Sequence, residues 1–254
     1  MQIQDIIRIA REAGDKILEI YHDEDFSKVV DFKDDNSPLT LADKASHEVI
    51  DAALRELTPN IPILSEEGRD MPFEERKGWT TFWCVDPLDG TKEFIKRNGQ
   101  FTVNIALVEN GVPTLGVIHT PVTGETYYGT TDGAYKKTGD ATAEKIAVRN
   151  NQAGNRIAVG SASHAAPEEE ELLAKYDVTE SLKRGSSLKF CMVAEGKADI
   201  YYRHNPTMEW DTAAGQAVVE AAGGTVFTGQ GQDSVRFFYN KENLRNGSFL
   251  VLGF

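Results

Sequence analysis

The sequence has few cysteines, no long apolar run and fewer basic than acidic residues. Cys84 and Cys191 match neither a metal-binding nor a redox spacing, so we expect two buried thiols in a reducing cytoplasm. No segment approaches the roughly 18 consecutive apolar residues of a membrane span. Asp5 and Arg8 interrupt the N-terminal stretch, which excludes a signal peptide there. These features predict a cytoplasmic protein without a membrane span.

The charge balance is acidic, with 27 Lys and Arg against 40 Asp and Glu, and the net charge is -13. Non-specific nucleic-acid binding needs a basic surface, so this class of partner is excluded. The same charge disfavours contact with anionic lipids. Anionic small molecules remain compatible if cations stand between their charges and those of the protein. No interface is recognisable, so the oligomeric state stays open.

Apolar periodicity predicts two helices in the N-terminal part, over residues 3–22 and 41–57, separated by a charged, turn-rich loop at 31–40. Short strands are expected within 61–68 and 80–87. From residue 100 onward the period changes to two, with turn signals at 110–111, 123–124 and 132–133. This pattern predicts an antiparallel meander.

After about residue 150 the pattern becomes an alternation of strands and helices. We expect strands within 155–164, 198–203, 224–228 and 247–254, and helices within 166–176, 187–196 and 212–224. The chain is therefore predicted to be a mixed α/β protein. It would have an N-terminal α+β domain at 1–150, with the antiparallel sheet and metal site, and a C-terminal α/β domain at 151–254.

The stretch "DPLDGT" places Asp86 and Asp89 where a strand is followed by a helix. Pro87 favours a rigid turn, Gly90 lets the main chain approach a ligand, and the helix beginning at Thr91 presents free amides to an anion. Carboxylates alone repel a phosphate by ~1 kcal/mol per close pair even in bulk water. Divalent cations remove that conflict, and hard oxygen ligands indicate Mg²⁺. The alternative is that Asp89 caps the helix and Asp86 is a surface turn residue.

Two further acidic positions could join this turn. Glu66 and Glu67 end a strand twenty residues upstream, and a neighbouring strand could bring them beside Asp86. They could equally form a solvated turn. Asp211 precedes an alanine-rich helix, where an aspartate is also a common N-cap. Each position alone is a modest signal.

The three motifs "SEEG", "DPLDGT" and "WDTAAG" occur together and in this order, and they resemble the inositol-monophosphatase-like, Mg²⁺-dependent, lithium-sensitive phosphatases over essentially the whole chain. The continuation "KEF", with "DNSPLTLAD", "RGSSLKFCMVAEGKADIYYR" and "PTMEWDTAAG", looks most like the CysQ-type branch of 3'(2'),5'-bisphosphate nucleotidases. The resemblance implies a five-layered αβαβα sandwich of the inositol monophosphatase and fructose-1,6-bisphosphatase type. The active site would lie at the junction of the two domains.

The resemblance also implies two Mg²⁺ ions. The first would be bound by Glu66, Asp86 and the backbone carbonyl of Leu88. The second would be bound by Asp86, Asp89 and Asp211, so that Asp86 bridges the two ions. A third, weaker ion near Glu66 is compatible with the same resemblance. Glu67 would orient a ligand or a metal-bound water.

For the substrate, the resemblance implies direct hydrolysis, with Thr91 and Asp43 accepting the proton of the attacking water. The second phosphate and the base would be contacted by His164, Ser186, Lys189 and Arg203. Ser186 and Lys189 are three residues apart and are expected on one helical face. Ordinary surface charge is the alternative for Lys189 and Arg203. All the substrate-contacting positions implied are Glu66, Leu88, Asp89, Gly90, Thr91, His164, Ser186, Lys189, Arg203 and Asp211.

The implied activity is Mg²⁺-dependent removal of the 3'-phosphate of adenosine 3',5'-bisphosphate, leaving AMP, in sulfur assimilation and nucleotide salvage. Some such enzymes also act on 3'-phosphoadenylyl sulfate, and some bacterial relatives associate peripherally with the inner membrane. A phosphatase of the same superfamily for inositol or sugar monophosphates is the nearest alternative. A non-catalytic protein that binds phosphorylated nucleotides is a third; its mark would be a lost metal ligand or a lost Thr91 and Asp43 pair, and all of these residues are present.

Overall fold

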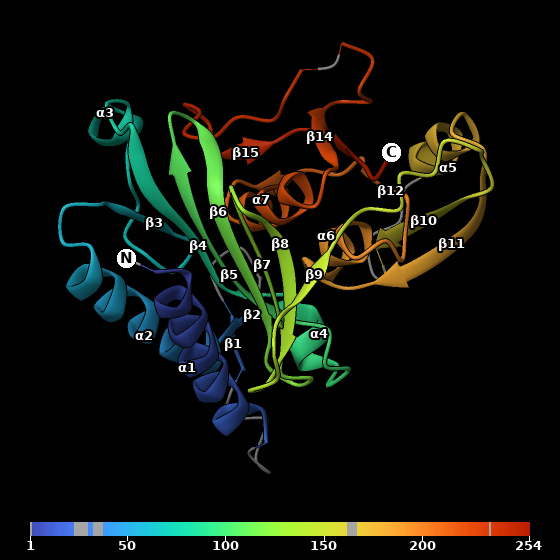
Figure 1. Ribbon diagram of the computed structural model, residues 1–254. Coiled ribbons are helices and arrows are strands. Elements are labelled where there is room, and N and C mark those ends of the chain that lie inside the picture. The colour runs from blue at the N-terminus through green and yellow to red at the C-terminus, as the bar shows by residue number, and fades with distance from the viewer. Residues whose placement is uncertain (1, 23–29, 33–37, 162–166, 234) are drawn as a thin grey trace.

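The computed structural model describes residues 2–22, 30–32, 38–161, 167–233 and 235–254, and these residues form five stacked layers (Figure 1). The layers are a helix pair, a seven-stranded sheet, a second helix pair, a five-stranded sheet and one further helix. This arrangement confirms the αβαβα sandwich expected from the sequence.

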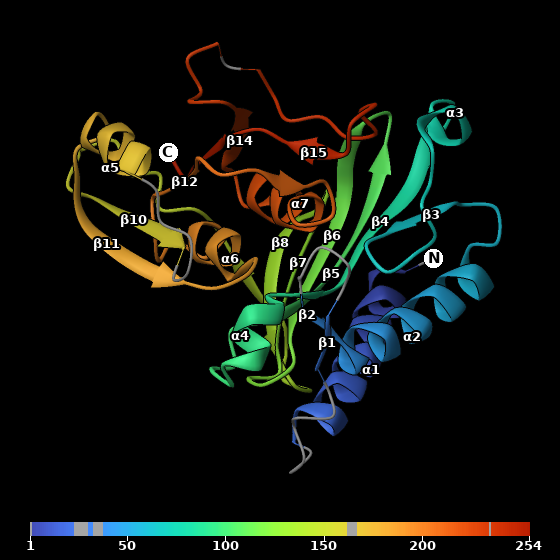
Figure 2. The ribbon, with the colours of Figure 1, turned by 180° about the vertical axis from the view of Figure 1, so that it is seen from behind.

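The helices of the three helical layers lie close to their predicted ranges. α1 (Ile3–Tyr21) and α2 (Leu41–Leu57) cover the outer face of the seven-stranded sheet. α6 (Leu188–Ala194) and α7 (Ala213–Ala221) lie between the two sheets in both views (Figures 1 and 2). α5 (Pro167–Ala174) packs on the outer face of the five-stranded sheet, where Leu172 joins a small apolar cluster.

The seven-stranded sheet contains the predicted meander. Its strands follow one another in chain order: β3 (Ile63–Ser65), β4 (Thr81–Asp89), β5 (Thr102–Glu109), β6 (Val112–Thr120), β7 (Glu125–Thr130), β8 (Gly133–Thr138) and β9 (Glu144–Ile146). β3 and β4 are parallel, and the other neighbours are antiparallel. Asn110 and Gly111, between β5 and β6, both have positive φ, as a primed hairpin turn requires.

Strand alternation divides the side chains of β4 and β5 between two hydrophobic cores. Trp83 and Ile105 belong to the core under α1 and α2, whereas Cys84 and Ala106 belong to the core under α6 and α7. The period-two pattern of the sequence therefore corresponds to a sheet buried on both faces. Cys84 and the other thiol, Cys191, are both buried and unoxidised, as predicted.

The five-stranded sheet is mixed and has the order β11 (Val178–Arg184), β10 (Arg156–Ser161), β12 (Ile200–Arg203), β16 (Phe249–Leu252) and β14 (Thr225–Thr228). The sequence did not indicate β11, because most of its side chains are exposed at the sheet edge and no apolar alternation marks it. Two further strand pairs are short: β1 (Val30–Phe32) with β2 (Pro38–Thr40), and β13 (Thr207–Met208) with β15 (Arg245–Asn246). The expectation of a plain loop at 31–40 was wrong where β1 and β2 pair.

In the described part of the chain, no helix combines the length and apolar character needed to cross a bilayer. The core under α6 and α7 includes residues from both sides of the expected domain boundary, for example Phe82 and Phe249. The boundary near residue 150 stays a prediction.

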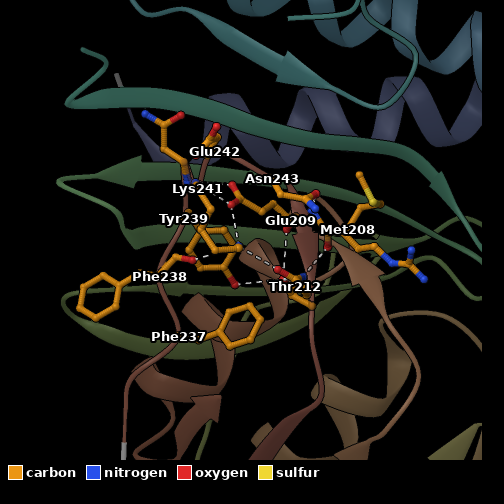
Figure 3. A network of polar contacts seen from close by, with 12 residues as sticks. Met208, Glu209, Thr212, Phe237, Phe238, Tyr239, Lys241, Glu242 and Asn243 are labelled. Atoms are coloured by element: carbon orange, nitrogen blue, oxygen red, sulfur yellow. Dashed lines mark hydrogen bonds and ion pairs between the residues drawn. The ribbon is translucent and has the colours of Figure 1, made fainter. Parts of the chain in front are cut away.

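A buried polar network joins the segment before α7 to the segment after β14 (Figure 3). The carboxylate of Glu209 is fully buried and accepts hydrogen bonds from the amides of Asn240 (2.8 Å) and Lys241 (3.0 Å) and from the Lys241 ammonium (2.6 Å). Arg76, the last residue of α3 (Phe73–Arg76), donates to the Asn240 side chain at 2.9 Å and to the Lys241 carbonyl at 2.6 Å. This network therefore joins three segments that are far apart in the sequence, through the charged side chains of Arg76, Glu209 and Lys241.

Replacing Lys241 by methionine would leave the Glu209 carboxylate buried without its ion partner. Losing the partner of a buried charge costs about 3–5 kcal/mol, and the partial exposure of the Lys241 side chain and the two remaining amide bonds favour the lower end of that range. We expect Lys241→Met to lower the free energy of unfolding by about 3 kcal/mol, measured by urea denaturation without divalent metal.

Lys77→Met is the matched control, because Lys77 pairs with Glu74 on the surface, where both side chains are more than half exposed. Such pairs contribute about 0–1 kcal/mol. Equal losses in the two variants would contradict the role given to the buried network.

Candidate active site

A cavity of about 470 Å³ opens where β4, α4 (Thr91–Ile95), α6 and the segment before α7 meet. Its wall is polar for the most part and includes both acidic and basic side chains. Nine of the residues predicted from the sequence line it: Asp43, Glu66, Asp89, Gly90, Thr91, Ser186, Lys189, Arg203 and Asp211.

A bulge in β4 directs Asp86 and Asp89 to the same side. Asp86 pairs with Asn104 of β5, and Asp89 pairs with Thr102, so β4 has one residue more than β5 between these pairs. In a regular strand, residues three apart point to opposite faces, and the extra residue cancels this inversion. The predicted turn is therefore a bulge within a longer strand, and both carboxylates reach the face that carries α6 and α7.

The main chain of this bulge lies between the two aspartates. The Leu88 amide donates to Asp86 Oδ1 at 3.1 Å, while the Leu88 side chain is buried in the core under α1 and α2. On the other side, the buried Ser46 hydroxyl of α2 donates to the Pro87 carbonyl at 2.7 Å. These contacts hold the segment that includes the Leu88 carbonyl, a predicted metal ligand.

Gly90 follows with a φ of 98°, in the left-handed region that favours glycine. A β-carbon there would lie 3.1 Å from the Gln100 carbonyl oxygen and 3.2 Å from Ser186 Cβ, so the site also lacks room for one. The helix that the sequence predicted to begin at Thr91 has five residues.

Three carboxylates converge at the end of this bulge. β3 runs parallel to β4 with Ser65 opposite Val85, which brings Glu66 beside Asp86, as the sequence suggested. Asp211 approaches from the segment before α7. One carboxylate oxygen from each of Glu66, Asp86 and Asp211 lies within 4.8 Å of the others.

Asp211 is held by its own segment rather than by α7. Its Oδ2 accepts a hydrogen bond from the Met208 amide at 2.7 Å, and the N-cap of α7 is Thr212, so Asp211 is not the cap. The Thr212 hydroxyl accepts hydrogen bonds from Tyr239 and Asn246, both at 3.1 Å, in the network of Figure 3. The buried network thus supports the residue next to Asp211.

The carboxylates strongly influence one another. Burial raises the pKa of Asp86 well above its ordinary value, and the charges of Glu66, Asp89 and Asp211 raise it further. The pKa of Asp211 is likewise raised, first by burial and then by Asp89 and Glu66. A cluster of hard oxygen donors whose charges repel fits a divalent cation, and this donor set is typical of Mg²⁺.

The cationic side of the cavity comes from α6 and β12. Lys189 is buried, its ammonium donates to the Ser186 carbonyl and lies 5.5 Å from the centre of the Tyr201 ring. Burial lowers the pKa of Lys189 to about 8, and the charge of Arg203 adds to this effect while Asp89 opposes it. Arg203 donates from Nε to the Asn205 carbonyl at 3.1 Å.

Ser186 does not share a helical face with Lys189, and this expectation was wrong. α6 begins at Leu188, and Ser186 has a left-handed backbone with a φ of 54°. The two residues are nevertheless adjacent through the bond between the Lys189 ammonium and the Ser186 carbonyl.

The remaining predicted residues lie as follows. Asp43 is buried in the first turn of α2 and lines the cavity. Glu67 is half-buried in the turn after β3. His164 lies outside the described residues. The catalytic, metal-binding and substrate-binding roles of all these residues stay predictions.

Sequence reasoning missed several cavity residues: Lys92, Glu93, Ser161, Gly185, Ser187, Phe190, Tyr201, Thr207, Thr212 and Phe249. It also missed Thr102 and Asn104, which lie behind the wall on the inward face of β5. A signal existed for these two, because they are polar residues in an otherwise apolar strand. Ser187 had no such signal, because a serine before a helix is most simply an N-cap.

Comparisons with known proteins agree on one family. The model of the inositol monophosphatase family matches residues 2–250. The chain is 48% identical, over 91% of its length and 92% of the relative's, to 3'(2'),5'-bisphosphate nucleotidase CysQ of Salmonella typhimurium.

Two solved structures extend this likeness. The crystal structure of CysQ from Bacteroides thetaiotaomicron, a bacterial member of the inositol monophosphatase family, has a TM-score of 0.86 and 47% identity, covering 100% of this chain and 98% of the other. An inositol monophosphatase from Zymomonas mobilis has a TM-score of 0.75 and 27% identity, covering 100% and 94% of the two chains. With the converging carboxylates and the five-layered fold, these matches show that the chain belongs to the inositol monophosphatase family.

Proposed function

We propose that this protein is a Mg²⁺-dependent 3'(2'),5'-bisphosphate nucleotidase that hydrolyses the 3'-phosphate of adenosine 3',5'-bisphosphate to give AMP and phosphate. One observation carries the proposal: a single cavity contains a cluster of carboxylates together with cationic side chains, among them Lys189 and Arg203. A metal-dependent phosphatase whose substrate has one phosphate group needs only the carboxylate cluster. A second cationic group suits a substrate with two phosphates. The name of the Salmonella typhimurium relative, 3'(2'),5'-bisphosphate nucleotidase CysQ, supports the same class of substrate.

Two Mg²⁺ ions would be held by Glu66, Asp86, the Leu88 carbonyl, Asp89 and Asp211, with a third near Glu66 compatible with this set. When bound, such ions neutralise charge on the phosphoryl oxygens and lower the pKa of water. Glu67 would orient one of the ligands from the adjoining turn. The fit rests on the hard oxygen donors and on the raised pKa of Asp86 and Asp211.

Residues of the protein would accept the proton of water and bind the phosphates. Asp43 and Thr91 would accept the proton of the attacking water, and the amides of Gly90 and Thr91 would hold the scissile phosphate. The water oxygen would form the new bond to phosphorus as the bond to the ribose 3'-oxygen breaks, and this oxygen would take up a proton from solvent to become the hydroxyl of AMP. His164, Ser186, Lys189 and Arg203 would contact the second phosphate and the base. The proposal includes a cytoplasmic role in sulfur assimilation and nucleotide salvage. It also includes inhibition by lithium and activity on 3'-phosphoadenylyl sulfate as a second substrate.

An inositol or sugar monophosphate phosphatase is the second candidate, because an inositol monophosphatase is among the similar structures. The buried Lys189 favours the bisphosphate, since its ammonium donates to a neutral acceptor, the Ser186 carbonyl, and a second phosphate would give it an anionic one. A non-catalytic binding protein is less favoured, because Asp43, Thr91 and every predicted acidic ligand are present.

The substrate proposal is tested by phosphate release from adenosine 3',5'-bisphosphate and from inositol 1-phosphate, each with and without Mg²⁺. We expect Mg²⁺-dependent release from the bisphosphate, reduced about 100-fold or more by Asp89→Asn, which removes one carboxylate charge from the site. Faster release from the inositol ester would keep the site but reject the nucleotidase. No release from either substrate would favour the binding protein.

Mg²⁺ should stabilise the protein more at alkaline than at acidic pH. In the unfolded chain Asp86 and Asp211 ionise near pH 4, and their pKa values are higher in the folded state. The folded state therefore binds more protons between those values, and without metal the free energy of unfolding falls as the pH rises through this interval. Because Mg²⁺ binds only the ionised carboxylates, we expect it to raise Tm more at about pH 8 than at about pH 5.5. Equal Tm shifts at both pH values, or none with Mg²⁺ beyond a NaCl control of the same ionic strength, would count against this site.

Lys189 should govern affinity for the second phosphate. Because its pKa is about 8, it loses its charge as the pH rises through that value, and KM for the bisphosphate should rise there. Lys189→Met should raise KM by about 10- to 100-fold, as expected for a lost charged hydrogen bond, and should abolish this pH dependence. With 3'-AMP, which lacks the second phosphate, KM should change little. A similar loss with both nucleotides would assign Lys189 to the scissile phosphate instead.

A further inference from the structure

Ser187 precedes α6, yet its hydroxyl does not cap that helix. The side chain is buried and lies in the cavity wall. Its Oγ is 2.7 Å from Asp89 Oδ2 and 3.3 Å from the Asp211 carbonyl oxygen. A serine before a helix usually caps it, but the hydroxyl of Ser187 is directed to Asp89, a predicted metal ligand.

Two residues of β5 continue this contact into the protein. Asn104 Nδ2 lies 2.8 Å from Ser187 Oγ, and Thr102 Oγ1 lies 3.1 Å from Asn104 Oδ1. Both side chains are buried and stand opposite Asp86 and Asp89 across the β4 bulge. The register between β4 and β5 that positions Asp86 and Asp89 therefore also positions Asn104 and Thr102 next to them.

The carboxylate at the end of the chain sets the direction of every hydrogen bond. Ionised Asp89 can only accept, so Ser187 must donate to it. Ser187 has one hydroxyl hydrogen, so its oxygen must accept from the Asn104 amide group. The Asn104 oxygen then faces Thr102, which must donate to it. Thr102 Oγ1 also lies 2.6 Å from Ser186 Oγ, and because the one Thr102 hydroxyl hydrogen goes to Asn104, Ser186 must donate to Thr102. The order is thus Ser186 to Thr102 to Asn104 to Ser187 to Asp89, and no member can reverse without losing a hydrogen bond.

We propose that Ser187, braced by Asn104 and Thr102, is a positioning residue that orients the Asp89 carboxylate for Mg²⁺. The bond to Oδ2 fixes the rotation of the carboxylate and directs its other oxygen away from Ser187. This inference rests on the proposed function, because it assumes that Asp89 is a metal ligand. Groups that orient ligands in this way commonly alter metal affinity by about 10- to 100-fold when removed.

The test compares Mg²⁺ binding by isothermal titration calorimetry with steady-state kinetics. Ser187→Ala should weaken the Mg²⁺ Kd about 10-fold, while saturating Mg²⁺ restores most of kcat and leaves KM for the bisphosphate unchanged. Ser187→Thr keeps the hydroxyl and should restore Mg²⁺ affinity. Asn104→Leu removes the brace with a side chain of similar size, and should weaken Mg²⁺ in the same direction even if Ser187→Ala folds poorly.

Thr126→Val is the control for a merely structural loss. It removes a buried hydroxyl of the same sheet, which contacts His119 at 2.9 Å and does not line the cavity. It should lower Tm without changing the Mg²⁺ Kd. A Kd within about twofold of wild type in both Ser187→Ala and Asn104→Leu would overturn the inference alone. Absence of Mg²⁺ binding by the wild-type protein would overturn the proposed function and the inference with it.

Discussion

Repulsion between carboxylates is the constraint on which this site depends. Three acidic groups come within 4.8 Å of one another at a partly buried position, where their mutual repulsion is larger than it would be in water. The chain holds the site's aspartates by one donor each: the Leu88 amide for Asp86, the Met208 amide for Asp211 and the Ser187 hydroxyl for Asp89. Each donor engages a single oxygen and leaves the carboxylate a second one. The protein therefore opposes the repulsion with contacts that preserve the capacity of the cluster to bind a cation.

The glycines of β6 and β7 that face α7 also serve this geometry. A β-carbon on Gly116 of β6 would lie 2.5 Å from the Ala214 carbonyl oxygen, and one on Gly129 of β7 would lie 2.6 Å from that of Ala217. α7 thus packs directly against the sheet, which larger residues at these positions would prevent. Since Asp211 immediately precedes this helix, the close approach brings it within reach of Asp86 on the same sheet. Glycines of the sheet therefore provide the packing that brings the carboxylate of Asp211 into the site.

Much of the fold was predictable because its signals are local. The helix stripes, the hairpin turns and the acidic motifs each depend on neighbouring residues, and the structure has them where the sequence indicated. The errors concern features that depend on tertiary contacts. Pro87 suggested the end of a strand, but a bulge tolerates its missing amide hydrogen, and β4 continues to Asp89. Ser186 suggested a helical position, but it has a left-handed backbone beside Gly90. The contact of Ser187 with Asp89 joins residues 98 apart, so no local pattern could reveal it.

The segment from Gly185 to Lys189 connects the two kinds of charge in the cavity. Ser187 contacts a carboxylate of the acidic cluster, whereas Lys189, two residues later, supplies a buried cation. The Gly185 amide donates to the Gln100 side chain at 2.8 Å, which fastens this segment to the loop between α4 and β5. Ser187 and Lys189 thus share a short segment with hydrogen bonds to the acidic cluster at one residue and to the α4–β5 loop at another. Under the proposed function, the separation between the acidic cluster and Lys189 would discriminate among anionic ligands by the distance between their two phosphates.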